Sequence, residues 1–291
     1  MFWAALRAAR PRQWVKNLFV AAPLIFSKHL GDRRALVLAA AAVAIFCALS
    51  SAVYLWNDLV DVEKDRAHPK KRLRPIAAGQ LGESHARLLA ALLAAGGVLS
   101  AVLLRFEFAA CALGYVLLNV AYSLYLKRVV YIDVLVIALG FLLRVIGGAL
   151  AISVEASPYL VLCTGLLACY LGFGKRAHEL KAAGAEAVLQ RPVLSGYHLP
   201  TLRFLLLLTA VATLVSYVLY TRSSHTVNYF HTDKMVWTAP FAAVGLGRFW
   251  MLISDHPTSD SPTEEMLSDR LFIANLVAWT LVTCAVIYFR W

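Results

Sequence analysis

The chain alternates between long apolar runs and short polar segments. A helix needs about 20 mostly apolar residues to cross a bilayer. By that measure the pattern predicts nine transmembrane helices, beginning near Gln13, Ala35, Ser84, Phe108, Val130, Pro158, Leu199, Lys234 and Leu271. The segments between the runs are too short for a soluble domain, so we expect one all-α transmembrane domain over residues 1–291.

The composition agrees with a membrane protein. Hydrophobic residues make up 60% of the chain and the mean hydropathy is +0.68, whereas roughly 45–50% is usual in soluble domains. The net charge is +11, but its Lys and Arg lie mainly between apolar runs, where they orient a membrane protein. We therefore expect the lipid bilayer as a partner and no nucleic acid. All five cysteines lie in apolar runs without CxxC spacing, so we expect free thiols.

The first residues carry a separate amphipathic signal. Phe2 and Trp3 alternate with Arg7 and Arg10, which is typical of a helix lying in the membrane interface over residues 1–12. A cytosolic start whose charges set the topology is equally compatible. The first apolar run contains Pro23 and lacks a small-residue cleavage site, so we expect it to be retained in the mature protein.

The distribution of charge predicts the orientation. With the N-terminus inside, nine spans place residues 57–75, 126–133, 174–198 and 254–270 on the cytoplasmic side, and three of these four segments are rich in Lys and Arg. The first outer segment is an exception, because it contains Lys28, Arg33 and Arg34. Every polar segment of catalytic character then lies on one face. We expect a multi-pass inner-membrane protein whose site opens to the cytoplasm.

The second predicted helix ends in a cluster of acids, within "NDLVDVEKDRAHPKKRLRP" (residues 57–75). Asn57, Asp61 and Asp65 are spaced i, i+4, i+8, and Asp58 precedes Asp61 by three, which places them on one face of a continuous helix. Clustered carboxylates repel one another unless a cation neutralises them, and an oxygen-only set favours Mg²⁺. We predict that these four residues bind Mg²⁺, with Mn²⁺ as a substitute, and hold a diphosphate. A salt-bridged helix end is the alternative.

A basic run follows at once. Lys70 and Arg72 are best explained by topology, whereas Lys71 and Arg74 are spaced i, i+3 and precede Pro75. Arg binds phosphate in a bidentate manner. We predict that Lys71 and Arg74, with Asp58 and Asp61, form the catalytic set.

Polar residues inside the apolar runs are further candidates. Lys16 and Asn17 lie in the first run, and Lys16 either reaches a phosphate or extends to the interface. Arg144, in "FLLRVIGGAL", is a functional candidate because intramembrane arginines are costly. Pairing of Arg144 with Glu155 is the alternative.

Two residues of the fourth polar segment are expected at the same mouth. Lys127 is a candidate for substrate binding. Asp133 either binds metal or substrate or pairs with Arg128. No set of Ser, His and Asp or of Cys and His suggests nucleophilic catalysis.

Three motifs resemble the UbiA superfamily of intramembrane prenyltransferases. "NDLVDVEKD" matches its first aspartate motif, and "RPIAAGQL" and "YSLYLKR" (residues 122–128) are also similar to that superfamily. The resemblance implies a nine-helix bundle around a central cavity, with Mg²⁺ and a diphosphate donor at the cytoplasmic mouth. It also implies that Tyr122 binds substrate.

One motif departs from the usual pattern. Typical members carry a second aspartate motif where this chain has "GFGKRAHEL", with Lys175, Arg176 and Glu179. Basic residues there suit a ligand with an additional phosphate. This segment, the opening "RPRQWVKNLFVAAPLIF" and "SPTEEMLSDR" resemble the decaprenyl-phosphate phosphoribosyltransferases.

That branch implies phosphoribosyl diphosphate (PRPP) as donor and a polyprenyl phosphate as acceptor, in the synthesis of arabinose-containing envelope polymers. Lys175, Arg176 and Glu179 then bind the C5 phosphate or the acceptor phosphate, with a topological charge pair as the alternative for Lys175 and Arg176. Conventional prenyl transfer to an aromatic or other acceptor remains open. A transporter fits less well, because the polar residues gather at one face instead of lining a path through the midplane. The sequence does not decide whether the chain forms a homo-oligomer.

Overall fold

The computed structural model describes residues 1–183, 192–254 and 262–289. Throughout these ranges the elements are helical, and eight helices are long and apolar enough to cross a membrane. The predicted helical class is confirmed. The chain divides into two compact units, residues 1–156 and 157–291. The predicted cytoplasmic segments 174–198 and 254–270 fall partly outside the described residues.

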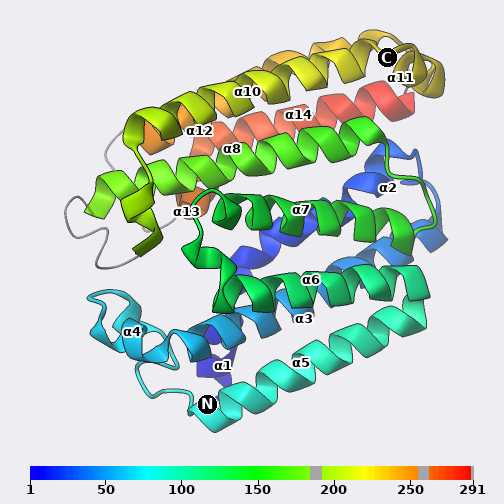
Figure 1. Ribbon diagram of the computed structural model, residues 1–291. Helices are drawn as coiled ribbons and strands as arrows, with labels where there is room; N and C mark the ends of the chain where they lie inside the picture. Colours follow the sequence, from blue (N-terminus) through cyan, green and yellow to red (C-terminus); the bar gives the residue numbers. More distant parts are fainter. Residues whose placement is uncertain (184–191, 255–261, 290–291) are drawn as a thin grey trace. The chain divides into compact units, whose positions relative to one another are not determined.

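The first unit is built around one long central helix. Its elements are α1 (Phe2–Ala8), η1 (Pro11–Ala21), α2 (Ala22–Phe26), α3 (Arg33–Val60), α4 (Val62–Ala67), η2 (Lys71–Leu73), α5 (Glu83–Leu104), α6 (Phe106–Leu124), η3 (Leu126–Arg128) and α7 (Ile132–Ala151). Helix α3 packs against α5, α6, α7 and η1 (Figure 1). Asp32 starts α3 by accepting hydrogen bonds from the backbone N–H groups of Arg34 and Ala35 at 2.8 and 3.3 Å.

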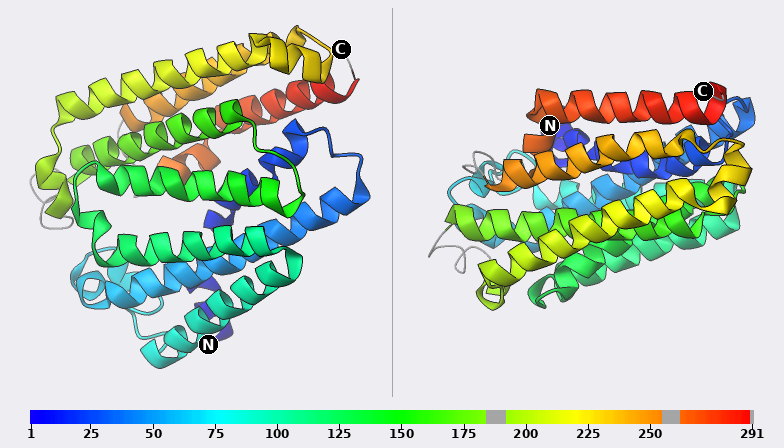
Figure 2. Two further views of the ribbon diagram at one scale, coloured as in Figure 1. Left: turned by 45° about the vertical axis from the view of Figure 1, so that its right-hand side comes forward. Right: turned by 90° about the horizontal axis from the view of Figure 1, so that it is seen from above.

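The second unit is also a packed set of long helices. It comprises α8 (Pro158–Ala183), η5 (Pro192–Gly196), α10 (Leu199–Arg222), α11 (Ser224–Phe230), η6 (Lys234–Thr238), α12 (Ala239–Ser254), α13 (Pro262–Ser268) and α14 (Arg270–Phe289). Helices α8 and α10 run side by side in both views of Figure 2, and α12 packs against α14.

The first predicted span differs from an ordinary transmembrane helix. The chain there forms the 11-residue 3₁₀ helix η1 followed by the five-residue helix α2. A 3₁₀ helix rises about 2.0 Å per residue and an α-helix 1.5 Å, so the two add up to about 30 Å, the thickness of a hydrocarbon core. The narrower 3₁₀ geometry therefore reaches membrane length with fewer residues than the predicted helix.

The N-terminal residues form a short helix at the same end of the first unit as the carboxyl end of α3. In α1, Ala4 and Ala8 are buried in a cluster with Leu55 of α3. Phe2 and Trp3 are 72% and 73% exposed. Such a helix, buried on one side and aromatic on the other, suits the membrane interface.

The contact between η1 and α7 depends on a glycine. A Cβ atom built on Gly148 would lie 1.9 Å from the carbonyl oxygen of Val20. We expect Gly148→Ala to destabilise the purified protein by about 1–3 kcal/mol, because one of the two helices must shift. Thermal unfolding in detergent measures the effect. The control is Gly114→Ala on α6, where a Cβ meets nothing within 4 Å; an equal midpoint in the two variants contradicts this packing.

Candidate active site

The acidic cluster lies where α3 ends, and the helix breaks inside it. Asp61 has φ −100° and ψ 9°, which separates α3 from the short helix α4. Asn57 and Asp58 belong to the last turn of α3, and Asp65 lies in α4. Backbone hydrogen bonds from Asp61 N to the carbonyl oxygen of Asn57 at 3.0 Å and from Asp65 N to that of Asp61 at 2.8 Å still connect the two helices across this residue. The four side chains form two groups of contacts.

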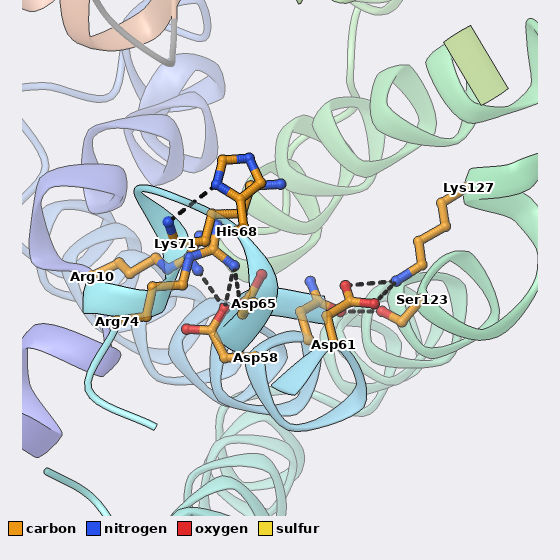
Figure 3. A network of polar contacts seen from close by, with 10 residues as sticks. Arg10, Asp58, Asp61, Asp65, His68, Lys71, Arg74, Ser123 and Lys127 are labelled. Atoms are coloured by element: carbon orange, nitrogen blue, oxygen red, sulfur yellow. Dashed lines mark hydrogen bonds and ion pairs between the residues drawn. The ribbon is translucent and has the colours of Figure 1, made fainter. Parts of the chain in front are cut away.

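The first group joins Asp58 and Asp65 through one arginine. A single nitrogen of Arg74, NH1, donates to Asp58 Oδ1 at 3.0 Å and to Asp65 Oδ2 at 2.6 Å (Figure 3). The two carboxylate side chains are only 2% and 5% exposed. Two buried like charges need such a cation, because burial leaves little solvent to separate them. The structure therefore brings the predicted site residues Asp58, Asp65 and Arg74 together in one ion-paired group.

The pKa of Asp65 depends on two opposing effects, burial and nearby positive charge. Burial raises the pKa of its carboxyl group above the ordinary value, and the positive charges of Arg74 and Lys71 counteract that rise. Lys71 is thus close enough to act on Asp65. Both Lys71 and Arg74 are half-buried, whereas Lys70 and Arg72 are exposed, which agrees with the predicted division of this run. His68 accepts hydrogen bonds from the backbone of Lys70 and Lys71, at 3.2 and 3.3 Å.

The second group lies toward α6 and η3. Lys127 Nζ donates to both oxygens of Asp61, at 2.8 and 2.7 Å. Asn57 accepts a hydrogen bond from Ser123 of α6. Figure 3 shows Asp61, Ser123 and Lys127 on one side of the α3 end and the pair of Asp58 and Asp65 on the other. Lys127, which the sequence analysis predicted to bind substrate, therefore lies at this cluster as the ion-pair partner of Asp61.

Sequence reasoning missed Arg10. Its NH2 group donates to Asp58 Oδ1 at 2.5 Å, so Asp58 receives two arginines, 48 residues before it and 16 after it. The signal was present in the opening segment "RPRQWVKN", which begins at Arg10 and carries part of the family resemblance. Spacing along the chain could not reveal the contact, because it joins an N-terminal loop to a distant helix.

Arg144 and Asn17 form a different, buried group. Arg144 donates to Asn17 Oδ1 at 2.9 Å, to the hydroxyl of Tyr115 at 2.8 Å and to the carbonyl of Gly140 at 2.8 Å. Asn17 also donates to Ser50 Oγ at 3.1 Å. The considered pairing of Arg144 with Glu155 does not form.

These contacts tie α7, η1, α6 and α3 together away from the acids. Arg144 lies 11 residues beyond Asp133, which is about 16 Å along an α-helix. Asp133 is fully buried in the first turn of α7. Lys16 and Tyr122 are both half-buried.

The basic motif of the second unit is a local cluster on α8. Arg176 is completely buried and donates to Glu179. Lys175 Nζ lies 4.0 Å from the other carboxylate oxygen of Glu179. One carboxylate thus pairs with two adjacent cations that lie one turn before it on the same helix. The motif SPTEEMLSDR contains Asp269, which forms a two-point ion pair with Arg248 of α12, at 3.1 and 2.7 Å. Hydrogen bonds from this arginine hold the pKa of Asp269 below its ordinary value.

The donor set at the end of α3 fits a hard divalent cation. Its oxygens come from three carboxylates and one amide, which are ligands that Mg²⁺ accepts. In the described ranges no three His, Cys, Asp or Glu side chains converge on one point. Figure 3 shows Arg74 in contact with both Asp58 and Asp65, and Lys127 in contact with Asp61.

Comparisons with known proteins identify the family of the chain. Residues 17–177 match the model of the UbiA prenyltransferase family. A decaprenyl-phosphate phosphoribosyltransferase of Mycolicibacterium smegmatis is 36% identical over 98% of this chain and 92% of its own length. The enzyme of that name from Corynebacterium glutamicum is 33% identical over 97% of this chain and 86% of its own.

A solved structure shares the fold. The UbiA homologue of Archaeoglobus fulgidus bound to GPP and Mg²⁺ superposes with a TM-score of 0.71, covering 97% of this chain and 100% of that one at 17% identity. Together with the eight apolar helices, these matches make the protein a multi-pass integral membrane protein. The chain belongs to the UbiA prenyltransferase family.

Proposed function

We propose that the chain transfers 5-phosphoribose from PRPP to a polyprenyl phosphate of the decaprenyl type and releases diphosphate. Two relatives that match nearly the whole chain carry the name of that reaction. The observation that carries the diphosphate chemistry is the bridging of buried Asp58 and Asp65 by Arg74. Carboxylates and cations interleaved in this way suit a ligand made of phosphates and metal.

The reaction depends more on stabilisation of the leaving diphosphate than on a general base. The bond from ribose C1 to the diphosphate oxygen breaks, and a bond from C1 to an oxygen of the acceptor phosphate forms. The sugar becomes oxocarbenium-like and the diphosphate gains negative charge, so preorganised cations lower the barrier. The acceptor phosphate is already an anion, so it attacks without losing a proton to the protein.

Asn57, Asp58, Asp61 and Asp65 would hold Mg²⁺, with Mn²⁺ as a substitute. When bound there, the ion neutralises charge on the diphosphate oxygens. Structures of UbiA homologues with bound Mg²⁺ support divalent-metal use in this fold.

The cations at the end of α3 bind the diphosphate of the donor. Arg74, Lys71 and Lys127 pair with, or act on, the carboxylates in the ligand-free structure. We infer that they transfer to phosphate oxygens when substrate arrives, since a diphosphate offers them a stronger set of acceptors than one carboxylate does. Tyr122, Lys16 and Asp133 supply further substrate contacts.

Lys175, Arg176 and Glu179 bind the second phosphate, either the C5 phosphate of PRPP or that of the acceptor. Their support is the pairing of two cations with one acid on α8, where typical family members carry a second acidic motif. Asn17 and Arg144 were predicted to contact substrate. Their buried hydrogen bonds to each other support a role in holding η1 instead.

We place the site and the N-terminus on the cytoplasmic side of the inner membrane. Lys and Arg are concentrated in the segments at the carboxyl end of α3 and between α6 and α7, as the positive-inside rule requires. Helix α1 packs beside that same end of α3. The whole chain, residues 1–291, then acts as one transmembrane domain with α1 in the interface.

The reaction is tested with purified protein in nanodiscs that contain decaprenyl phosphate. Ribose-labelled PRPP and Mg²⁺ should give label in the organic phase and an equal amount of free diphosphate. EDTA should abolish both, because the carboxylates need a divalent ion to accept the donor. Release of diphosphate without labelled lipid indicates simple hydrolysis and contradicts the proposed transfer.

A further inference from the structure

Arg10 has an unusual backbone conformation directly before a proline. Its φ and ψ are 53° and 62°, in the left-handed region that non-glycine residues rarely adopt. A conformation of this kind persists only where surrounding contacts hold it. The surrounding contacts therefore hold Arg10 in an unfavourable backbone conformation, and this conformation sets the direction of its side chain.

The contacts that hold this segment come from one serine of α3. Ser51 Oγ shares its proton between the carbonyl oxygens of Ala9, at 3.1 Å, and Cys47, at 2.8 Å, and accepts from Trp14 Nε1 at 3.0 Å. Residues on both sides of Arg10 are thus fixed to the same side chain. Further along, Asn17 binds Ser50 of the same helix. This set of hydrogen bonds fixes the position of Arg10 relative to α3.

The Arg10 side chain is aimed at the carboxylate cluster. Its guanidinium group lies 5.2 Å from the ring centroid of Tyr54 and donates to Asp58, one helical turn further along α3. The side chain is 30% exposed, close to the 31% of Arg74, whereas Asp58 is 2% exposed. A guanidinium has five N–H donors in a planar fork. The two arginines therefore present donors on the open side of a buried carboxylate.

Four cations, Arg10, Lys71, Arg74 and Lys127, gather around three carboxylates, those of Asp58, Asp61 and Asp65. Arg74 alone already bridges Asp58 and Asp65, and Lys127 pairs with Asp61. Arg10 adds a second cation to a carboxylate oxygen that Arg74 already contacts. The net positive charge of the four cations and three carboxylates suits an anionic ligand.

We propose that Arg10 binds the diphosphate group of the donor, opposite Arg74, and leaves Asp58 when the ligand enters. This inference deepens the proposed function and depends on it only for the identity of the donor. Inorganic diphosphate carries the recognised group without the ribose. It therefore tests Arg10 separately from the choice between PRPP and a prenyl diphosphate.

The test measures binding of inorganic diphosphate and of PRPP by calorimetry, with Mg²⁺ and the full-length protein in nanodiscs. Arg10→Gln should weaken both at least tenfold, as expected for loss of a hydrogen bond between charged groups. Arg10→Gly should behave alike, and it suits the left-handed backbone, so the fold is preserved. Arg12→Gln removes the same charge from an exposed position two residues away and should change affinity less than twofold.

Unchanged affinity for diphosphate in Arg10→Gly overturns the proposal and leaves Arg10 as a counter-ion of Asp58. If Arg10→Gly lowers the unfolding temperature of the ligand-free protein without changing its affinity for diphosphate, the proposal is likewise overturned. If the wild-type protein binds diphosphate but not PRPP, and Arg10→Gly weakens the diphosphate, the Arg10 inference holds while the proposed donor is wrong.

Discussion

Replacing Asp58 or Asp61 by asparagine is expected to lower turnover at least tenfold, about 1.4 kcal/mol or more of barrier. Each substitution removes a charged ligand for Mg²⁺ and also a partner of a site cation. Asp58 pairs with Arg10 and Arg74, and Asp61 pairs with Lys127. Steady-state rates at saturating Mg²⁺ and PRPP measure the loss.

Glu63→Gln is the matched control for both. Glu63 lies two residues after Asp61 in the sequence, but its side chain is 80% exposed and pairs with Arg66. Surface ion pairs of this kind contribute little, so we expect less than a twofold change. Undiminished rates in both aspartate variants would remove the metal-site assignment.

Replacing Lys175 by alanine is expected to raise the KM for PRPP more than tenfold, since a hydrogen bond to a charged group contributes about 1.5–3 kcal/mol. Arg176→Ala should do the same, but it also empties a fully buried site beside Glu179. Lys175 is the cleaner variant, because its side chain is 39% exposed. Initial rates over a range of PRPP concentrations give the KM.

A second donor substrate tests whether Lys175 binds the C5 phosphate of PRPP. Ribose 1-diphosphate lacks the C5 phosphate, so wild type should prefer PRPP strongly and the Lys175 variant should prefer it less. Arg203→Ala, at an exposed position near the start of α10, is the control and should match wild type. A variant that weakens only the polyprenyl phosphate assigns this motif to the acceptor.

Most of the helices could be predicted because long apolar runs leave few alternatives in a bilayer. The runs expected near Ala35, Ser84 and Leu271 begin at Arg33, Glu83 and Arg270. A helix satisfies its own backbone hydrogen bonds, so composition and length decide it locally. The first run was different. Its 3₁₀ geometry and its glycine contact with α7 depend on tertiary packing that no local pattern contains.

The candidate site was predictable in its residue types and less so in its geometry. Clustered acids beside a membrane helix indicated a charge-binding site. The interruption of the helix at Asp61 has no signal in the spacing. The contacts of Arg10 with Asp58 and of Lys127 with Asp61 span 48 and 66 residues, so only the folded structure reveals them.

A direct comparison of donors tests the central claim. Purified protein with Mg²⁺ and decaprenyl phosphate receives either ribose-labelled PRPP or labelled geranyl diphosphate, and label in the lipid product is counted. Phosphoribosyl transfer predicts that PRPP labels a new polyprenyl-phosphate sugar and that geranyl diphosphate is left intact. Consumption of geranyl diphosphate with PRPP untouched would contradict the account and establish a conventional prenyltransferase.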